Sequence, residues 1–220
     1  MNYIIACLSS IILSILLTLQ LIKLFEHIDN EHNTRLSLSN TIVIIICSTL
    51  FGILSPIFIW DNQYDTLKNS IEMLNITILF VYLLFQSYFD QKICMVYSSV
   101  SLIMIALEIL YVIFMYINNY ISIYGIYTLG VLIIPFVLYI ISLFRGIGLG
   151  DVLIYLVISI YYIGSKQQTI ASMLINIIVT NILFIVTSLI VKIIKKDKNN
   201  HQPLTIFISI VTLLFAIVKI

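Results

Sequence analysis

Three acidic side chains, Asp90, Glu108 and Asp151, lie at or within stretches of apolar sequence, whereas most other acidic residues lie in polar segments. An ionisable group at membrane depth is costly, so each of the three is a candidate functional residue. Asp90 closes one apolar stretch and Asp151 opens another. Two carboxylates at one depth can share a proton, so that one acts as base and one as acid. Such a pair activates water for attack on a peptide carbonyl.

The residues next to these two acids support a chemical role. Gly148 and Gly150 precede Asp151 and lack a Cβ, so backbone or substrate can approach the acid closely. Asp151 is expected at a helix start, where amide dipoles favour its ionised form. Lys92 and Arg145 flank the two aspartates. Orienting the chain in the membrane is sufficient to explain both cations; a sharper hypothesis has them meeting anionic headgroups or tuning the nearby acids.

Glu108 lies midway along its own apolar stretch, far in depth from the proposed pair. We expect it to be protonated and hydrogen-bonded to another helix, with Thr128, Asn176 or Asn181 as partner. A structural polar contact is favoured over a functional role.

The composition indicates the kind of element that must position these acids. Of the 220 residues, 61% are hydrophobic and only 10% are charged, against about half and a quarter in soluble domains. One core could not bury so much apolar surface, so much of it must face lipid. The net charge of +1 says little about partners. The one basic run, from Lys192 to Lys198, directly follows an apolar segment and is better explained as a membrane anchor than as a nucleic-acid site, so no nucleic acid is expected as a partner. The three separated cysteines favour neither a zinc site nor a disulfide framework.

Eight apolar segments are near the 17–25 residues that a bilayer core requires. They run over about 3–24, 41–60, 72–89, 96–118, 121–144, 151–165, 168–191 and 203–219. In lipid every backbone polar group must bond within its own segment, which favours helices. The sequence therefore predicts an all-α integral membrane protein, a single polytopic domain over 1–220 with about eight transmembrane helices.

The lysines and arginines predict the orientation of these helices. Eight of the eleven lie at the odd-numbered connections or the segment ends beside them, and three lie on the other side. This bias places the odd connections in the cytoplasm and both termini outside. The third segment then runs inward and the sixth outward, so Asp90 and Asp151 are both expected at the cytoplasmic face of the cell membrane.

The stretch Gly148-Leu149-Gly150-Asp151 resembles the GxGD signature of membrane aspartyl proteases, and its surroundings resemble the type IV prepilin peptidases. In that family the first aspartate ends a helix before a basic loop, as Asp90 does before Lys92. The second begins a short helix with a glycine near its far end, as Gly164 stands here. Motif similarity is confined to about 86–98 and 145–164, within a predicted peptidase core of about 72–191. Val96-Tyr97-Ser98 replaces the usual Ile-Pro-Asn, and Leu153 stands where many members have lysine.

The resemblance implies an endopeptidase that cleaves prepilins or pseudopilins after a glycine that ends their basic leader. The products would serve a type IV pilus, protein secretion or competence for DNA uptake, and the assembly machinery of such a system is a possible partner beside membrane lipids. Water is the implied nucleophile, without a metal. The paired CxxC motifs that bind zinc in larger members are absent. S-adenosylmethionine would be a cofactor only if the methyltransferase activity of some relatives were retained.

Two other functions stay open at this point. A small proton-coupled transporter could use Asp90, Glu108 and Asp151 as a relay, with the glycines breaking a helix. A non-catalytic relative would bind a prepilin without cleaving it.

Overall fold

The computed structural model describes residues 2–28, 38–60, 65–93, 96–121, 125–144, 148–165, 170–195 and 204–218. Over these residues the chain forms eight α-helices and no strand, which confirms the all-helical expectation. They are α1 (Asn2–Ile28), α2 (Leu38–Ile59), α3 (Thr66–Ile93), α4 (Ser98–Ile117), α5 (Gly125–Leu143), α6 (Leu149–Gly164), α7 (Ile170–Lys195) and α8 (Leu204–Val218). Each apolar segment of the sequence corresponds to one helix. The largest difference is at α3, which begins before the predicted 72 because the polar residues ahead of that position continue the helix.

Three of the described helices are long and apolar enough to cross a membrane: Thr66–Asp90, Ser98–Ile117 and Ile170–Ile190. The other apolar helices within the described residues are shorter. Large apolar side chains are exposed along these helices; Leu110 and Ile117 of α4 are 62% and 68% exposed. Such surfaces are unfavourable in water and suit lipid. The structure therefore indicates a membrane protein, while the eight-span bundle stays a prediction.

The chain divides into two compact units, Met1–Val81 and Tyr82–Ile220, and the division falls within α3. We call them unit 1 and unit 2. Asp90 and Asp151 both belong to unit 2. The predicted peptidase core of about 72–191 leaves out α8, which the structure places in the same unit as the two acids.

Unit 1 is held together by small and hydroxyl-bearing side chains. The Ser10 hydroxyl of α1 lies 3.1 Å from that of Ser55 in α2 and 3.3 Å from that of Thr77 in α3. Gly52 lets α2 approach α1 closely, since a Cβ there would lie 2.7 Å from the Ser14 hydroxyl. Small residues and hydroxyl bonds commonly join helices within membranes.

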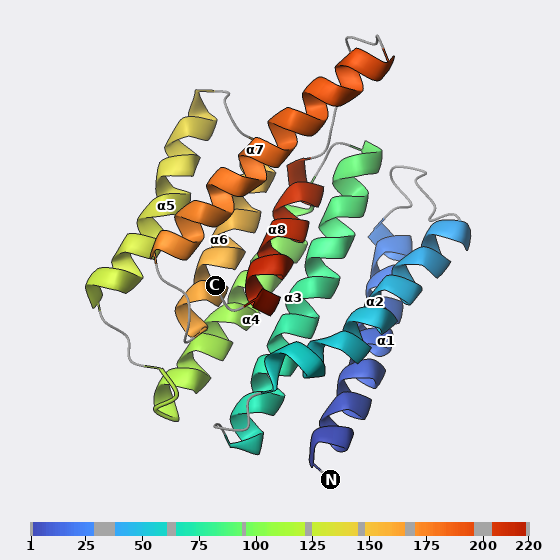
Figure 1. Ribbon diagram of the computed structural model, residues 1–220, viewed down its shortest axis with the longest axis vertical. Helices are drawn as coiled ribbons and strands as arrows, with labels where there is room; N and C mark the ends of the chain where they lie inside the picture. The colour runs from blue at the N-terminus through green and yellow to red at the C-terminus, as the bar shows by residue number, and fades with distance from the viewer. Residues whose placement is uncertain are drawn as a thin grey trace. The chain divides into compact units, whose positions relative to one another are not determined.

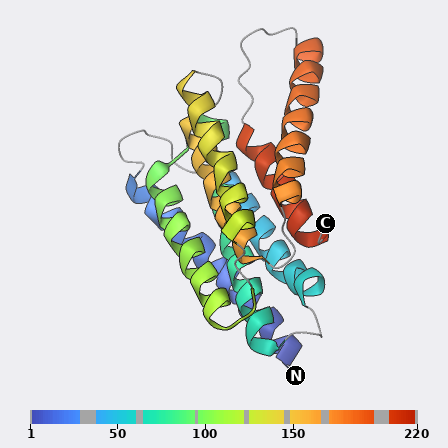
Figure 2. The same cartoon turned by 90° about the vertical axis from the view of Figure 1, so that its left-hand side faces the viewer.

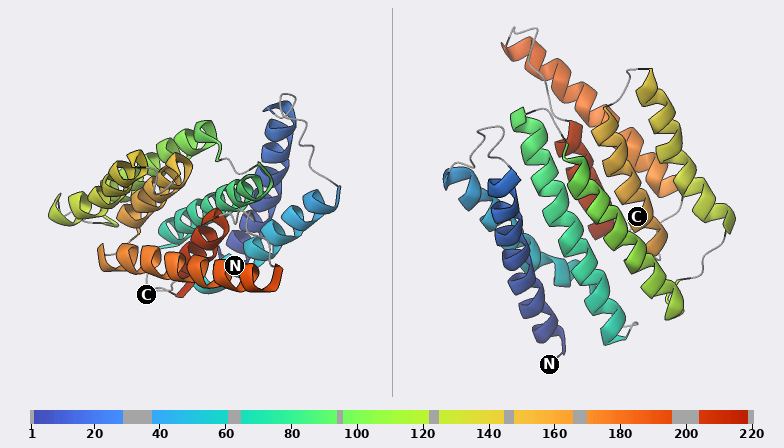
Figure 3. Two further views of the ribbon diagram at one scale, coloured as in Figure 1. Left: turned by 90° about the horizontal axis from the view of Figure 1, so that it is seen from above. Right: turned by 180° about the vertical axis from the view of Figure 1, so that it is seen from behind.

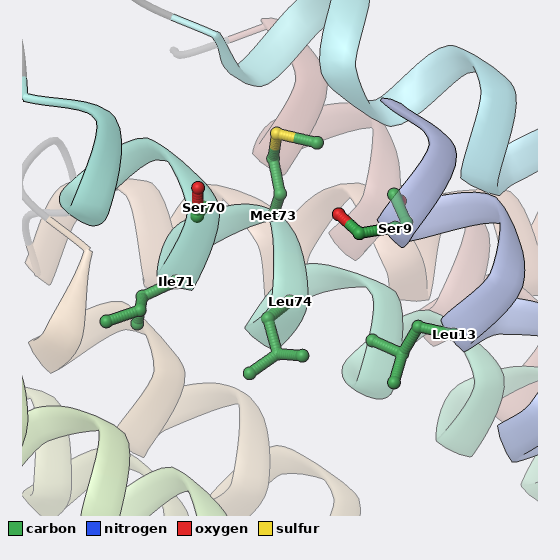
Figure 4. Close-up of a pocket in the computed structure, with 7 residues that line it drawn as sticks. Ser9, Leu13, Ser70, Ile71, Met73 and Leu74 are labelled. Carbon is green, nitrogen blue, oxygen red and sulfur yellow. The ribbon is translucent and has the colours of Figure 1, made fainter. Parts of the chain in front are cut away.

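Unit 1 also contains a cavity of about 290 Å³, between α1 and the first turns of α3. Figure 4 shows its lining, in which serine hydroxyls stand among apolar side chains: Ser9, Ser10, Leu13, Ser70, Ile71, Met73 and Leu74. No candidate acid belongs to this lining. The cavity is therefore separate from the site described below.

In unit 2, the end of α3 and the beginnings of α4, α6 and α8 lie at the same end (Figure 1; Figure 3, right). Helix α6 packs against α4, α5 and α8, and α7 lies beside α8 (Figure 2). The α6 side chains Ile154, Val157 and Ile158 are fully buried. The sixth apolar segment is thus short and surrounded by protein on several sides, a position in which it need not match the thickness of the lipid by itself.

Candidate functional site

Asp90 lies in the last turn of α3 and is only 7% exposed. Its Oδ2 atom accepts a hydrogen bond from the Thr205 backbone N–H at 3.1 Å and another from the Thr205 hydroxyl at 2.6 Å. Thr205 is the second residue of α8, where backbone N–H groups have no partner within the helix. Asp90 is therefore a buried acceptor that joins two helices, rather than a solvated acid at a helix end.

A second polar contact joins the same two helices one turn away. The hydroxyls of Ser87 in α3 and Ser209 in α8 lie 2.7 Å apart. Ser209 also donates to the backbone oxygen of Thr205 at 2.7 Å. Both serines are buried. Helices α3 and α8 are thus fixed to each other at two successive turns, which restricts the position of the Asp90 carboxylate.

Asp151 is the third residue of α6, as the sequence predicted for a helix start. Gly148 is the N-cap of α6, with an extended backbone, and its carbonyl accepts the Asp151 N–H at 3.1 Å. The Asp151 carboxylate lies back toward this cap, since a Cβ on Gly148 would come 3.2 Å from Oδ2. A carboxylate in the first turn of a helix meets favourable amide dipoles. Unlike Asp90, Asp151 is partly exposed.

The connection between α3 and α4 is fixed to the helix that carries Asp90. The Gln86 side chain donates to the Tyr97 carbonyl at 3.1 Å and accepts the Tyr97 N–H at 3.1 Å. The rings of Phe89 and Tyr97 meet edge to face, with their centres 4.9 Å apart. Tyr97 therefore has a defined place against α3.

The start of α6 packs on this same connection. A Cβ on Gly150 would lie 2.5 Å from the Val96 Cβ, a separation that real side chains do not adopt. The Val96 side chain thus fills the space beside Gly150 that a Cβ would otherwise occupy. The start of α6 thus lies against Val96, and the end of α3, which carries Asp90, lies at the same end of unit 2 (Figure 1).

Further along α6 from Asp151, buried polar side chains join α6, α7 and α8. Tyr155 lies one helical turn after Asp151 and is 1% exposed. The Asn176 side-chain amide donates to the Tyr162 hydroxyl at 2.7 Å and to the Thr212 hydroxyl at 3.1 Å. Hydrogen bonds between buried side chains fix the relative positions of helices.

The remaining predicted residues are placed as follows. Glu108 is fully buried in α4, a helix that packs on α6. Of its suggested partners, Asn176 donates to Tyr162 and Thr212, and Asn181 donates to the backbone of its own helix. The Thr128 side chain lies outside the described residues. So do Arg145 and the side chain of Lys92, although Lys92 itself belongs to the last turn of α3. Within the described part of the chain, no three His, Cys, Asp or Glu residues gather as a metal site would require.

The sequence did not lead us to expect the contact between Thr205 and Asp90. A signal for it exists: Thr205, Ser209 and Thr212 follow one another at helical spacing in an otherwise apolar segment. This spacing puts three hydroxyls on one face of a helix, and all three side chains are buried.

Comparison with protein-family models, with curated proteins and with solved structures gave no match to this chain.

Proposed function

We propose that this protein is a membrane aspartyl endopeptidase that cleaves the leader of type IV prepilins or pseudopilins, with Asp90 and Asp151 as its catalytic pair. The observation that carries the proposal is the contact of Gly150 with Val96, which joins the start of α6 to the segment that follows Asp90. The GxGD resemblance supplies the reaction and the substrate class.

The surroundings of the two acids differ in a way that suits acid–base catalysis. Asp90 is buried and has one carboxylate oxygen bonded twice by Thr205, whereas Asp151 is partly exposed at the start of its helix. Catalytic carboxyl pairs work because their environments differ, so that one group is charged while the other holds a proton. In the proposed reaction the charged group takes a proton from water as the water attacks the peptide carbonyl, and the protonated group donates to the leaving nitrogen.

The expected orientation of the helices matches the proposed substrate. A prepilin has a basic leader in the cytoplasm and an apolar stem in the bilayer. Its cleavage site therefore lies at the cytoplasmic face. The charge bias of the connections predicts that the C-terminal end of α3 and the start of α6 face the cytoplasm too. The exposed apolar side chains of the helices suit a membrane location for both enzyme and substrate.

The test is co-expression with several type IV prepilins whose basic leader ends in glycine, read as a shift in prepilin size on a gel. We expect cleavage by the natural chain and a loss of at least about 1,000-fold in Asp90→Asn and in Asp151→Asn. Equal amounts of each variant in the membrane are the control. Cleavage that persists in either variant would contradict the aspartyl mechanism, and binding without cleavage by the natural chain would indicate a non-catalytic relative.

A second candidate function, proton-coupled transport, is favoured by one observation: Glu108 is fully buried in a helix able to cross a membrane. Intramembrane carboxyl groups often form proton relays. Glu108→Gln separates the two functions. A peptidase would keep its cleavage rate in this variant, whereas a transporter would lose proton flux into vesicles that contain the purified protein.

A further inference from the structure

The Asp90 carboxylate depends on a helix that lies outside both motif regions. Thr205 stands 115 residues after Asp90 and supplies two donors to the same oxygen atom, Oδ2. Thr205 is fully buried and Asp90 nearly so. The shorter of the two bonds, 2.6 Å from the Thr205 hydroxyl, has the length typical of an O–H donor on a carboxylate.

Among the described residues, the hydrogen bonds to the Asp90 carboxylate come from Thr205 and fall on Oδ2, so the other oxygen, Oδ1, can take a second role. Because both Thr205 bonds fall on Oδ2, they fix the rotation of the carboxyl group about its Cβ–Cγ bond and so determine where Oδ1 points. A catalytic carboxyl has to hold its reacting oxygen within a few tenths of an ångström of the productive position. A carboxylate held through one oxygen meets that requirement at the other.

The support extends beyond Thr205 itself. Ser209, one turn further along α8, bonds the Thr205 carbonyl and lies 2.7 Å from the Ser87 hydroxyl. Ser87 lies nearly one turn before Asp90 on α3. The contact of Thr205 with Asp90 is therefore braced by a neighbouring contact between the same two helices, as expected for a group that positions a reacting side chain.

We infer that Thr205 is a positioning residue for Asp90, and that α8 belongs to the peptidase site. The inference rests on the proposed function. It adds a residue and a helix that the resemblance to prepilin peptidases does not supply, since the matching motifs end near 164.

The test compares Thr205→Val with Thr205→Ser, using the full chain and the same co-expressed prepilins, then purified protein for kcat and KM. Valine keeps the shape of threonine and the backbone N–H but removes the hydroxyl, so we expect kcat to fall roughly 10- to 100-fold with KM little changed. Serine keeps the hydroxyl, so the kcat of Thr205→Ser should lie within about threefold of that of the natural chain.

Thr212→Val is the matched control. It removes one fully buried hydroxyl from the same helix, one that contacts Asn176 rather than Asp90. We expect a similar loss of thermal stability in both valine variants but a loss of kcat only at Thr205. If Thr205→Val does not fold, Thr205→Ala against Thr212→Ala gives the same comparison.

The outcomes separate this inference from the function on which it rests. An unchanged kcat in Thr205→Val, beside an inactive Asp90→Asn, would overturn the positioning role and leave the peptidase intact. An equal loss of kcat in Thr212→Val would also overturn it, because the effect would then come from helix packing. Absence of cleavage by the natural chain would overturn the proposed function and the inference together.

Discussion

The polar residues of α7 differ in whether their hydrogen bonds cross to another helix. Asn176 is fully buried and donates from α7 to Tyr162 of α6 and Thr212 of α8. Asn181 lies on the exposed side of the same helix and donates only to the Ile177 carbonyl one turn earlier. The two residues have the same chemistry and different structural roles. They provide a matched pair for measuring what a polar contact between helices contributes.

We predict that Asn176→Ala lowers the free energy of unfolding by about 0.6–2 kcal/mol, because Tyr162 and Thr212 lose a buried partner. Asn181→Ala should change it by less than about 0.5 kcal/mol. Unfolding of the purified protein in detergent, followed by circular dichroism, measures both. Equal effects of the two substitutions would contradict a bracing role for the Asn176 contacts.

At the scale of elements, α4 and α6 run in the same direction (Figure 3, right), and both ends of α6 lie close to α4 or to the residues just before it. Gly150 meets Val96 at the start of α6, and Gly164 meets Tyr111 at its end. The sequence analysis expects Gly150 to admit backbone or substrate close to Asp151; in the structure both glycines allow close packing of α6. Val96 and Tyr111 take up the space that two missing Cβ atoms leave.

We predict that Gly164→Ala destabilises the protein by about 1–3 kcal/mol, because its Cβ would collide with the buried ring of Tyr111. Gly130→Ala is the control: its Cβ would meet the Cδ1 atom and, at 3.1 Å, the Cγ1 atom of Ile170, a side chain whose end can move. Alanine also favours a helix over glycine by up to about 1 kcal/mol, so Gly130→Ala should leave stability unchanged or raise it. Melting temperatures in detergent test both, and a stable Gly164→Ala would show that the Tyr111 ring yields.

At the scale of the whole molecule, the charge bias of the connections predicts which ends of the helices face the cytoplasm. Ser99 is exposed in the first turn of α4, next to the connection expected inside. Asn118 is exposed at the other end of α4, next to the connection expected outside. Because α4 is one of the helices long enough to cross a membrane, these two positions should lie on opposite sides of it.

In intact cells a membrane-impermeant maleimide should therefore label Asn118→Cys but not Ser99→Cys, after replacement of Cys7, Cys47 and Cys94 by serine. Permeabilised cells should show labelling at both positions. Labelling of Ser99→Cys alone in intact cells would reverse the predicted orientation and place Asp90 and Asp151 outside, where a prepilin leader could not reach them.

Hydropathy predicted the helices well because the cost of unsatisfied backbone in lipid leaves few alternatives to a helix. It predicted Asp151 at a helix start and Asp90 near a helix end, and both acids lie there. It could not predict that Asp90 is buried against Thr205, since that contact joins residues 115 positions apart. Threonine has little effect on hydropathy, so its position in α8 carries information only through the spacing of Thr205, Ser209 and Thr212. The division within α3 likewise has no signal in composition.

The separation between Asp90 and Thr205 also has a consequence for the order of events during synthesis. A ribosome adds about 5–20 residues per second, so the 115 residues that follow Asp90 up to and including Thr205 take roughly 6 to 23 s to make. During that interval the helix that binds Asp90 does not yet exist. The proposed peptidase would therefore be inactive until α8 is inserted. Until then it would not cleave its own nascent chain or other proteins at the insertion site.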